Sequence, residues 1–246
     1  CDIDDQDAFT IDYWLPAHAA PLAKVYREAF HIRSLYEWQV QCLNQTLTDP
    51  NKNLIYCAPT SGGKTMVAEV MMAKRLLEAQ STKTGNGKTK KAMVIAPFIS
   101  IVEEKTDEFM MKFGESSLGF QCKAFHSNVG APISTTEFED LHICVCTIEK
   151  ANSLINQLIE CGRLDEICTL VIDEVHMIMD VHRGYLLELL LAKVLFMNID
   201  CQIIGMSATL PNVAELAKWL NAHLYVSSYR PVPLKEYIKL GNTVYT

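Results

Sequence analysis

Several features that would assign this sequence to other classes of protein are missing from it. Acidic residues outnumber basic ones by 29 to 22, which gives a net charge of −7. Any nucleic-acid binding must therefore depend on local groups and not on a globally basic surface. The longest apolar stretches, 93–102 and 186–196, are shorter than the roughly 18–20 residues that a membrane span needs. These absences exclude a basic coat protein and a membrane-spanning protein, and we expect no membrane partner.

Cysteine pairs with the spacing of a zinc site or a disulfide framework are also missing. The nine cysteines are an odd number and form no C-x-x-C motif, a pattern typical of a reducing compartment. Cys144 and Cys146 lie two residues apart, which places both on one face of a strand. We expect them in a core and predict no zinc. The first twelve residues are acidic, unlike the basic start of a signal peptide, and we interpret the sequence as an internal fragment.

The apolar residues that are present alternate between two patterns. Runs of four to six residues rich in Val, Ile and Cys are separated by longer segments with a helical period. This alternation predicts an α/β domain, doubly wound, with a mostly parallel sheet and helices on both faces. The expected strands are 53–58, 92–96, 122–125, 143–147, 170–173 and 202–206. The expected helices are 19–30, 64–80, 99–113, 149–161, 184–196 and 213–220.

A Gly-Lys-Thr triplet opens a predicted helix directly after the strand 53–58. This context is typical of a phosphate-binding loop, in which backbone N–H groups and the helix N-terminus surround phosphates. Lys64 would supply a charge to the β- and γ-phosphates and Thr65 a hydroxyl to Mg²⁺, so we expect ATP and Mg²⁺ as cofactors. The loop begins with Ala58 where the strict pattern has glycine. Its candidate cofactor-binding residues are Pro59, Thr60, Ser61, Gly62, Gly63, Lys64 and Thr65.

Two adjacent carboxylates, Asp173 and Glu174, end the strand 170–173. The carboxyl ends of strands are where α/β sheets bind ligands. We expect Asp173 to hold Mg²⁺ with Thr65, and Glu174 to orient and deprotonate an attacking water. With Lys64 they form the predicted catalytic group. A solvated acidic turn is the alternative, which the upstream phosphate loop disfavours.

These motifs, in this order, resemble the first RecA-like domain of a superfamily 2 helicase with a DEVH box. The phosphate loop matches residues 58–65, the second motif matches 173–176 and the third, Ser-Ala-Thr, matches 207–209. The resemblance spans about residues 15–245 and implies a RecA-like P-loop fold and ATP hydrolysis. The residues that it implies in coupling are His176, Ser207, Ala208, Thr209 and Arg183. For Arg183, pairing with an acid of the site and contact with phosphate both stay open.

Four phrases resemble the helicase domain of DNA polymerase theta and its stand-alone DNA-repair helicase relatives. They are residues 36–39, 146–152, 182–188 and 230–234. This branch implies single-stranded or partly duplex DNA as substrate, a role in DNA repair and a location in the nucleus. It also implies that Gln39 contacts adenine, since an amide can pair with N6 and N7 at once. An exposed helical glutamine is the alternative.

The family binds nucleic acid with loops that follow strands, where backbone N–H groups meet phosphates without recognising sequence. In this chain those loops are 97–100, 126–127 and 147–150. The residues predicted to bind nucleic acid are Pro97, Phe98, Ser100, His126, Ser127, Thr147, Glu149 and Lys150. Ordinary helix caps at Ser100 and Thr147 are compatible with the same positions.

We expect residues 1–228 to form the RecA-like domain, with 1–35 as a lead-in, and 229–246 to be a linker and the start of a truncated second RecA-like domain. The family's arginine finger, in a Gln-x-x-Gly-Arg-x-Gly-Arg stretch of that second domain, does not occur here. We therefore expect this stretch alone to hydrolyse ATP very slowly and to unwind nothing. Three alternatives stay open: an RNA helicase of the same superfamily, a nucleotide-gated interaction module, and a small-molecule kinase, which the Ser-Ala-Thr motif disfavours.

Overall fold

A seven-stranded parallel sheet forms the centre of the computed structural model, which describes residues 6–81, 89–127, 129, 136–208, 211–231, 235 and 237–245. The strand order is β3-β4-β2-β5-β6-β1-β7, and every neighbouring pair is parallel. The expected doubly wound fold is confirmed. The strands are β1 (Asn53–Cys57), β2 (Lys91–Ala96), β3 (Cys122–Phe125), β4 (Ile143–Thr147), β5 (Ile167–Ile172), β6 (Gln202–Ser207) and β7 (Ala222–Val226).

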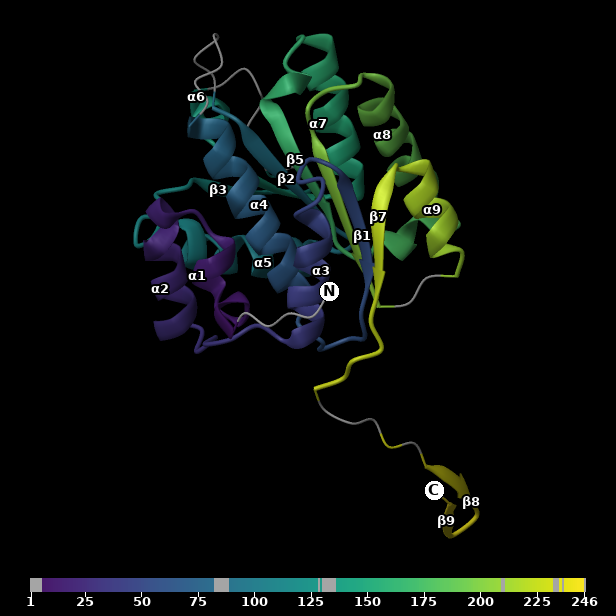
Figure 1. Ribbon diagram of the computed structural model, residues 1–246. Helices are drawn as coiled ribbons and strands as arrows, with labels where there is room; N and C mark the ends of the chain where they lie inside the picture. The colour runs from purple at the N-terminus through teal and green to yellow at the C-terminus, as the bar shows by residue number, and fades with distance from the viewer. Residues whose placement is uncertain are drawn as a thin grey trace.

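Helices cover both faces of this sheet (Figure 1). On one face, α4 contacts β5 and β6, and α5 contacts β3 and β4. On the other, α7 contacts β2 and β4, and α9 contacts β1 and β7. The helices are α1 (Ile11–Trp14), α2 (Ala20–Glu28), α3 (Glu37–Thr46), α4 (Lys64–Ser81), α5 (Ile99–Phe113), α6 (Thr136–Glu139), α7 (Ile148–Glu160), α8 (Gly184–Phe196) and α9 (Val213–Trp219). Short 3-10 helices are η1 (Gln6–Phe9), η2 (Ala17–Ala19), η3 (Leu164–Glu166) and η4 (Val175–Met179).

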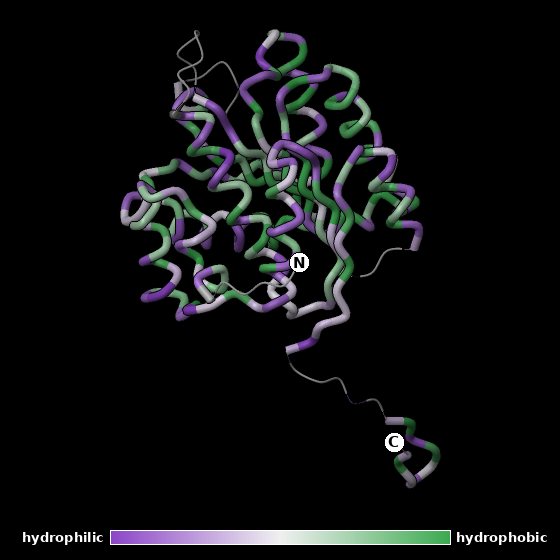
Figure 2. The backbone as a smooth tube through the Cα atoms, viewed as in Figure 1, coloured by the Kyte–Doolittle hydropathy of each residue, from purple (hydrophilic) through white to green (hydrophobic). Residues whose placement is uncertain are grey.

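The central strands are apolar on both faces because both are covered. Leu54 and Tyr56 of β1 point into the core on the α4 side, whereas Ile55 points into the core on the α8 side. Figure 2 shows hydrophobic residues concentrated in these central strands. Cys144 and Cys146 share one face, as predicted, and are fully buried on the α7 side. Burial raises the pKa of the Cys144 thiol to about 12.

One helix, α3, and one strand, β7, were not predicted from the sequence. Helix α3 begins with a capping box in which the Tyr36 amide donates to Gln39 Oε1 at 2.7 Å. Strand β7 pairs with β1 at the edge of the sheet; four of its residues are partly buried and the last, Val226, is exposed. The expected lead-in also contributes to the core, since Trp14, Leu22 and Tyr26 are buried there. The prediction of strand 170–173 started too late, because β5 begins at Ile167.

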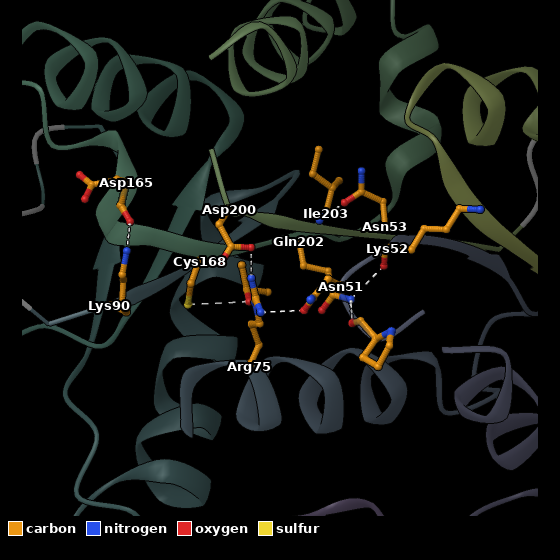
Figure 3. A network of polar contacts seen from close by, with 12 residues as sticks. Asn51, Lys52, Asn53, Arg75, Lys90, Asp165, Cys168, Asp200, Gln202 and Ile203 are labelled. Carbon is orange, nitrogen blue, oxygen red and sulfur yellow. Dashed lines mark hydrogen bonds and ion pairs between the residues drawn. The ribbon is translucent and has the colours of Figure 1, made fainter. Parts of the chain in front are cut away.

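Polar contacts close the amino-terminal edge of the sheet (Figure 3). Arg75 of α4 donates to Asn51 Oδ1 at 2.8 Å and pairs with Asp200. Gln202 Nε2 donates to two backbone carbonyls of the turn before β1, at 2.8 and 2.9 Å. The side-chain oxygen of Asn53 accepts from a backbone N–H of β6 at 2.7 Å. The loops at the opposite, carboxyl-terminal edge contain the predicted site.

Two short strands, β8 (Ile238–Leu240) and β9 (Thr243–Tyr245), pair antiparallel near the C-terminus. Figure 1 shows this hairpin apart from the sheet. Thr209 and residues 232–234 lie outside the described residues. Among the described helices, none combines the length and the apolar character needed to cross a membrane.

Candidate active site

Three adjacent strands, β5, β6 and β1, bring the predicted catalytic loops together. In parallel strands the carboxyl ends lie at the same edge, and Cys57 of β1 is in register with Ser207 of β6. The Ala58 N–H donates to the carbonyl of Ser207 at 3.0 Å. The phosphate loop follows β1 and the two acids follow β5, so both predicted motifs lie beside Ser207.

The phosphate loop has a backbone that side chains would not permit. Gly63 adopts a φ of +80°, and a Cβ at this position would lie 2.8 Å from Gln39 Nε2. A Cβ at Gly62 would lie 2.8 Å from the Pro59 carbonyl oxygen. Helix α4 begins directly afterwards at Lys64, so its first N–H groups face the loop. The geometry is that of an anion-binding helix N-terminus.

Two side chains of helix α3 donate hydrogen bonds to the backbone of the phosphate loop. Trp38 Nε1 donates to the Gly62 carbonyl at 3.1 Å, and Gln39 Nε2 donates to the Gly63 carbonyl at 2.8 Å. Gln39 is 3% exposed, so the alternative of an exposed helical glutamine is wrong. Its contact with adenine stays a prediction. The supporting role of Trp38 was missed, although a buried indole N–H generally requires an acceptor.

The acid pair has one ion pair and one oxygen without a hydrogen bond. Asp173 Oδ2 lies 3.2 Å from Lys105 Nζ of α5, a partner that the sequence did not suggest. Glu174 adopts a φ of +54°, which is strained for a residue with a side chain. Its buried Oε2 has no hydrogen-bond partner among the described residues, although it lies 3.1 Å from His176 Nδ1. His176 Nδ1 is hydrogen-bonded to Ser207 Oγ at 3.1 Å.

These residues fit a nucleotide with its metal ion. Among the described residues, the Lys64 ammonium pairs with no carboxylate within 4.0 Å. It is therefore available to phosphate. Glu174 Oε2 is available to accept a proton or a hydrogen bond. Thr65 and Asp173 supply the oxygen ligands that Mg²⁺ prefers.

The other half of the same edge, formed by β3, β4 and β2, holds an open groove of about 790 Å³. All residues predicted to bind nucleic acid line it, except His126. The lining residues are Pro97, Phe98, Ile99, Ser100, Ser127, Thr147, Glu149, Lys150, Ser153 and Arg183. His126 does not line the groove, because it is buried with Nε2 3.4 Å from Glu103 Oε1; its contact with nucleic acid stays a prediction. The loops after three different strands therefore meet as one surface.

Arg183 holds the groove together through an acid of the groove. Its Nε and Nη2 donate to the two carboxylate oxygens of Glu149 at 2.6 and 3.1 Å, and its Nη1 donates to the Pro97 carbonyl at 2.6 Å. Burial alone would raise the pKa of Glu149, but the hydrogen bonds from Arg183 outweigh it and hold that pKa below its usual range. The acid that pairs with Arg183 is therefore Glu149, outside the catalytic pair.

Helices α5 and α7 begin near the two residues that were considered as helix caps, Ser100 and Thr147. Thr147 Oγ1 accepts from the Lys150 N–H at 3.4 Å, so Thr147 is the N-cap of α7. Phe98 occupies the N-cap position of α5, which places Ser100 inside the helix. The cap interpretation is therefore confirmed for Thr147 and wrong for Ser100.

Three known proteins resemble this chain over most of its length. DNA polymerase theta from Drosophila melanogaster is 46% identical over 86% of the chain and 10% of that protein. Helicase POLQ-like from Homo sapiens is 43% identical over 95% of the chain and 20% of that protein. ATP-dependent DNA helicase Hel308 from Methanococcus vannielii is 36% identical over 87% of the chain and 27% of that protein. The chain thus spans only a minor part of each relative.

Solved structures and a family model agree with these relatives. The crystal structure of DUF1998 helicase MrfA bound to DNA superposes with a TM-score of 0.66 over 87% of this chain and 30% of that one. At 17% identity this likeness shows the fold alone. The DEAD/DEAH box helicase model matches residues 36–216, which include the phosphate loop, the acid pair and the groove. The chain belongs to the DEAD/DEAH box helicase family.

Proposed function

We propose that this chain is the ATP-binding half of an ATP-dependent DNA helicase or translocase that acts in DNA repair in the nucleus. The observation that supports this best is the division of one sheet edge. The ends of β5, β6 and β1 carry the predicted phosphate loop and acid pair, and the ends of β3, β4 and β2 form the groove beside them. A motor requires a mechanical connection between its nucleotide site and its nucleic-acid site, and here both lie at one edge of the same sheet.

Each residue of the site has a distinct role in ATP hydrolysis. The loop N–H groups and Lys64 bind the phosphates, and the charge of Lys64 stabilises the oxygens that become more negative as the γ-phosphoryl group leaves. Mg²⁺, when bound by Thr65 and Asp173, would neutralise charge on the same oxygens. Glu174 Oε2 orients a water in line with the γ-phosphate and takes its proton. Gln39 contacts the adenine.

The coupling of ATP hydrolysis to movement depends on the contact between β6 and the loop after β5 that includes Asp173 and Glu174. His176 lies between Glu174 and Ser207, at 3.1 Å from an oxygen of each. A shift of Glu174 during hydrolysis would change that contact and move Ser207 with Ala208, which follows it; Thr209 completes the motif. The second RecA-like domain of the longer protein is the expected recipient, and residues 229–246 are the proposed connection to it.

DNA is the proposed substrate because one of the relatives named above is an ATP-dependent DNA helicase and another is a DNA polymerase. The groove itself offers backbone donors, hydroxyls and Lys150, none of which distinguishes DNA from RNA. An RNA helicase of the same family is therefore the second candidate. A nucleotide-gated interaction module without unwinding activity is the third.

The experiment is an ATPase assay on the protein extended through its second RecA-like domain. Turnover is measured alone, with single-stranded DNA and with RNA of the same sequence. Glu174→Gln should lower the DNA-stimulated rate by about 10²–10⁴-fold, because it removes a general base, while retaining ATP binding. Glu215→Gln, a charge change on the exposed surface of α9, is the control and should leave the rate unchanged.

Each result supports one of the three candidates. Stimulation by DNA that Glu174→Gln abolishes supports the DNA motor. Stimulation by RNA alone supports the RNA helicase. Turnover indifferent to both nucleic acids contradicts a motor and favours the nucleotide-gated module.

A further inference from the structure

Lys105 is a buried cation with a single described ion-pair partner, the acid that is proposed to hold the metal. The residue is 8% exposed, and its ammonium lies 3.2 Å from Asp173 Oδ2, which is itself on a mostly buried side chain. A lysine is rarely buried unless it is paired. The contact therefore fixes Asp173 in its present position.

The helix that includes Lys105 also forms part of the groove. Helix α5 begins at Ile99, and Ile99 and Ser100 line the groove together with the N-cap residue Phe98. With a rise of 1.5 Å per residue, Lys105 lies about 7.5 Å further along the helix than Ser100. One and a half turns of helix thus separate a groove residue from the residue that holds Asp173.

The segment between them is tightly packed. Val102 and Phe109 of α5 are buried in the core, and Thr106 Oγ1 donates to the Val102 carbonyl at 2.7 Å. A helix packed in this way moves as a rod, because close-packed side chains resist local deformation. A displacement at the groove end therefore reaches Lys105 with little loss.

We propose that Lys105 is a positioning residue that couples occupation of the groove by nucleic acid to the acid pair. This inference rests on the proposed function. Nucleic acid that contacts the start of α5 shifts the helix, and the ammonium of Lys105 shifts with it. The carboxylate of Asp173 follows because a charge pair in a poorly solvated position is costly to break. The geometry of the metal-binding acid then differs between the free and the occupied groove.

Coupling of this kind is reciprocal, so binding measurements can test it. If nucleic acid alters nucleotide affinity by a factor, the nucleotide alters nucleic-acid affinity by the same factor, which is commonly about 5–150. The affinity for fluorescent single-stranded DNA is measured by anisotropy, with and without a non-hydrolysable ATP analogue and Mg²⁺. The protein is extended through its second RecA-like domain.

Lys105→Met should reduce the coupling factor to within about twofold of one. Lys105→Gln should do the same, because its amide carries no charge, although it can still donate a hydrogen bond. If Lys105→Met does not fold, as judged by circular dichroism, Lys105→Gln provides the result. Lys105→Arg should restore most of the coupling. Asp107→Asn, an exposed charge change on the same helix, should leave it intact.

The outcomes separate this inference from the function on which it rests. If the unaltered protein couples analogue and DNA binding and both neutral variants couple equally well, the role of Lys105 is overturned. If the unaltered protein neither binds DNA nor hydrolyses ATP, the proposed function itself fails. A lower melting temperature with unchanged coupling identifies Lys105 as a structural residue only, which also overturns the inference.

Discussion

Lys112 is a buried lysine that pairs with the buried carboxylate of Glu69, and the effect of its removal on the free energy of unfolding can be calculated. Its Nζ donates to both carboxylate oxygens of Glu69, at 2.8 and 3.0 Å, and the hydroxyl of Tyr26 donates to Glu69 Oε2 at 2.6 Å. The side chains of Lys112 and Glu69 are 4% and 1% exposed. This cluster joins α2, α4 and α5, so it fastens the N-terminal helices to the domain.

Lys112→Met keeps most of the length of the side chain and removes its charge together with its hydrogen-bond donors. Glu69 is then left as a buried carboxylate without a cation, which typically costs about 3–5 kcal/mol. For a domain of this size each kcal/mol lowers Tm by about 2–4 °C. The expected decrease in Tm is therefore about 6–20 °C, measured by circular dichroism at pH 7.

The contribution of Lys112 to the stability of the fold depends on pH. Burial alone would lower the pKa of Lys112, but the charges of Glu69 and Glu108 outweigh it and raise that pKa. A raised pKa in the folded state stabilises the fold fully below the ordinary pKa of lysine, and the stabilisation is lost as pH rises through the folded value. At pH 7 the whole contribution is present, and it should decline only in strongly alkaline solution.

Two variants make the reasoning refutable. Lys24→Met removes an exposed lysine whose ammonium lies 3.9 Å from Glu28, and it should cost less than about 0.5 kcal/mol. Glu69→Gln combined with Lys112→Met should recover most of the loss, because no buried charge is then left unpaired. If Lys112→Met costs no more than Lys24→Met, a buried, uncompensated Glu69 is the wrong explanation.

Three further predictions concern the site and the edge of the sheet. Gly63→Ala forces a methyl group to within 2.8 Å of Gln39 Nε2 at a φ of +80°, a conformation that costs about 1–2 kcal/mol, so the affinity for a fluorescent ATP analogue should fall about tenfold. Arg183→Ala leaves Glu149 as an uncompensated acid in the groove, so DNA affinity measured by anisotropy should fall roughly three- to tenfold, and more at low salt. Burial and the positive charge of Lys91 lower the pKa of His142 from its ordinary value of 6.5. The unfolded state therefore binds the proton more readily, and the free energy of unfolding should decrease as pH falls from about 7 through 6.5 to the folded pKa. His142→Gln should flatten this part of the Tm-against-pH curve.

Buried strands were predicted well because two covered faces require continuous apolar runs. The run Leu170–Ile172 and the acids after it appear in the structure as expected. Strand β7 was missed because an edge strand needs no such run, and it contains His223 among its five residues. Helix α3 was missed because its sequence is rich in glutamine and asparagine and therefore has a weak helical pattern of apolar residues.

The residues of the predicted catalytic loops could be identified in advance because each motif is a local pattern. The contacts that support those residues could not. Lys105 and Asp173 meet only because β2, which precedes α5, pairs with β5. In the same way, Arg183 meets Glu149 only once α8 has packed on α7. Such pairs depend on strand order, which the hydrophobic pattern does not determine.

Strand order also explains why the two predicted sites lie side by side. Strand β2 lies between β4 of the groove half and β5 of the catalytic half, and the Asp173 N–H donates to the carbonyl of Ile95 in β2 at 2.8 Å. The backbone of the acid loop is thus fixed to the strand that leads into the groove, while the side chain of Asp173 is fixed to the helix that follows that strand. A ligand that displaces the end of β2 must disturb both contacts. The proposed communication between the groove and the acid pair would therefore require no long-range change in the fold, only a small movement at the boundary between two adjacent strands.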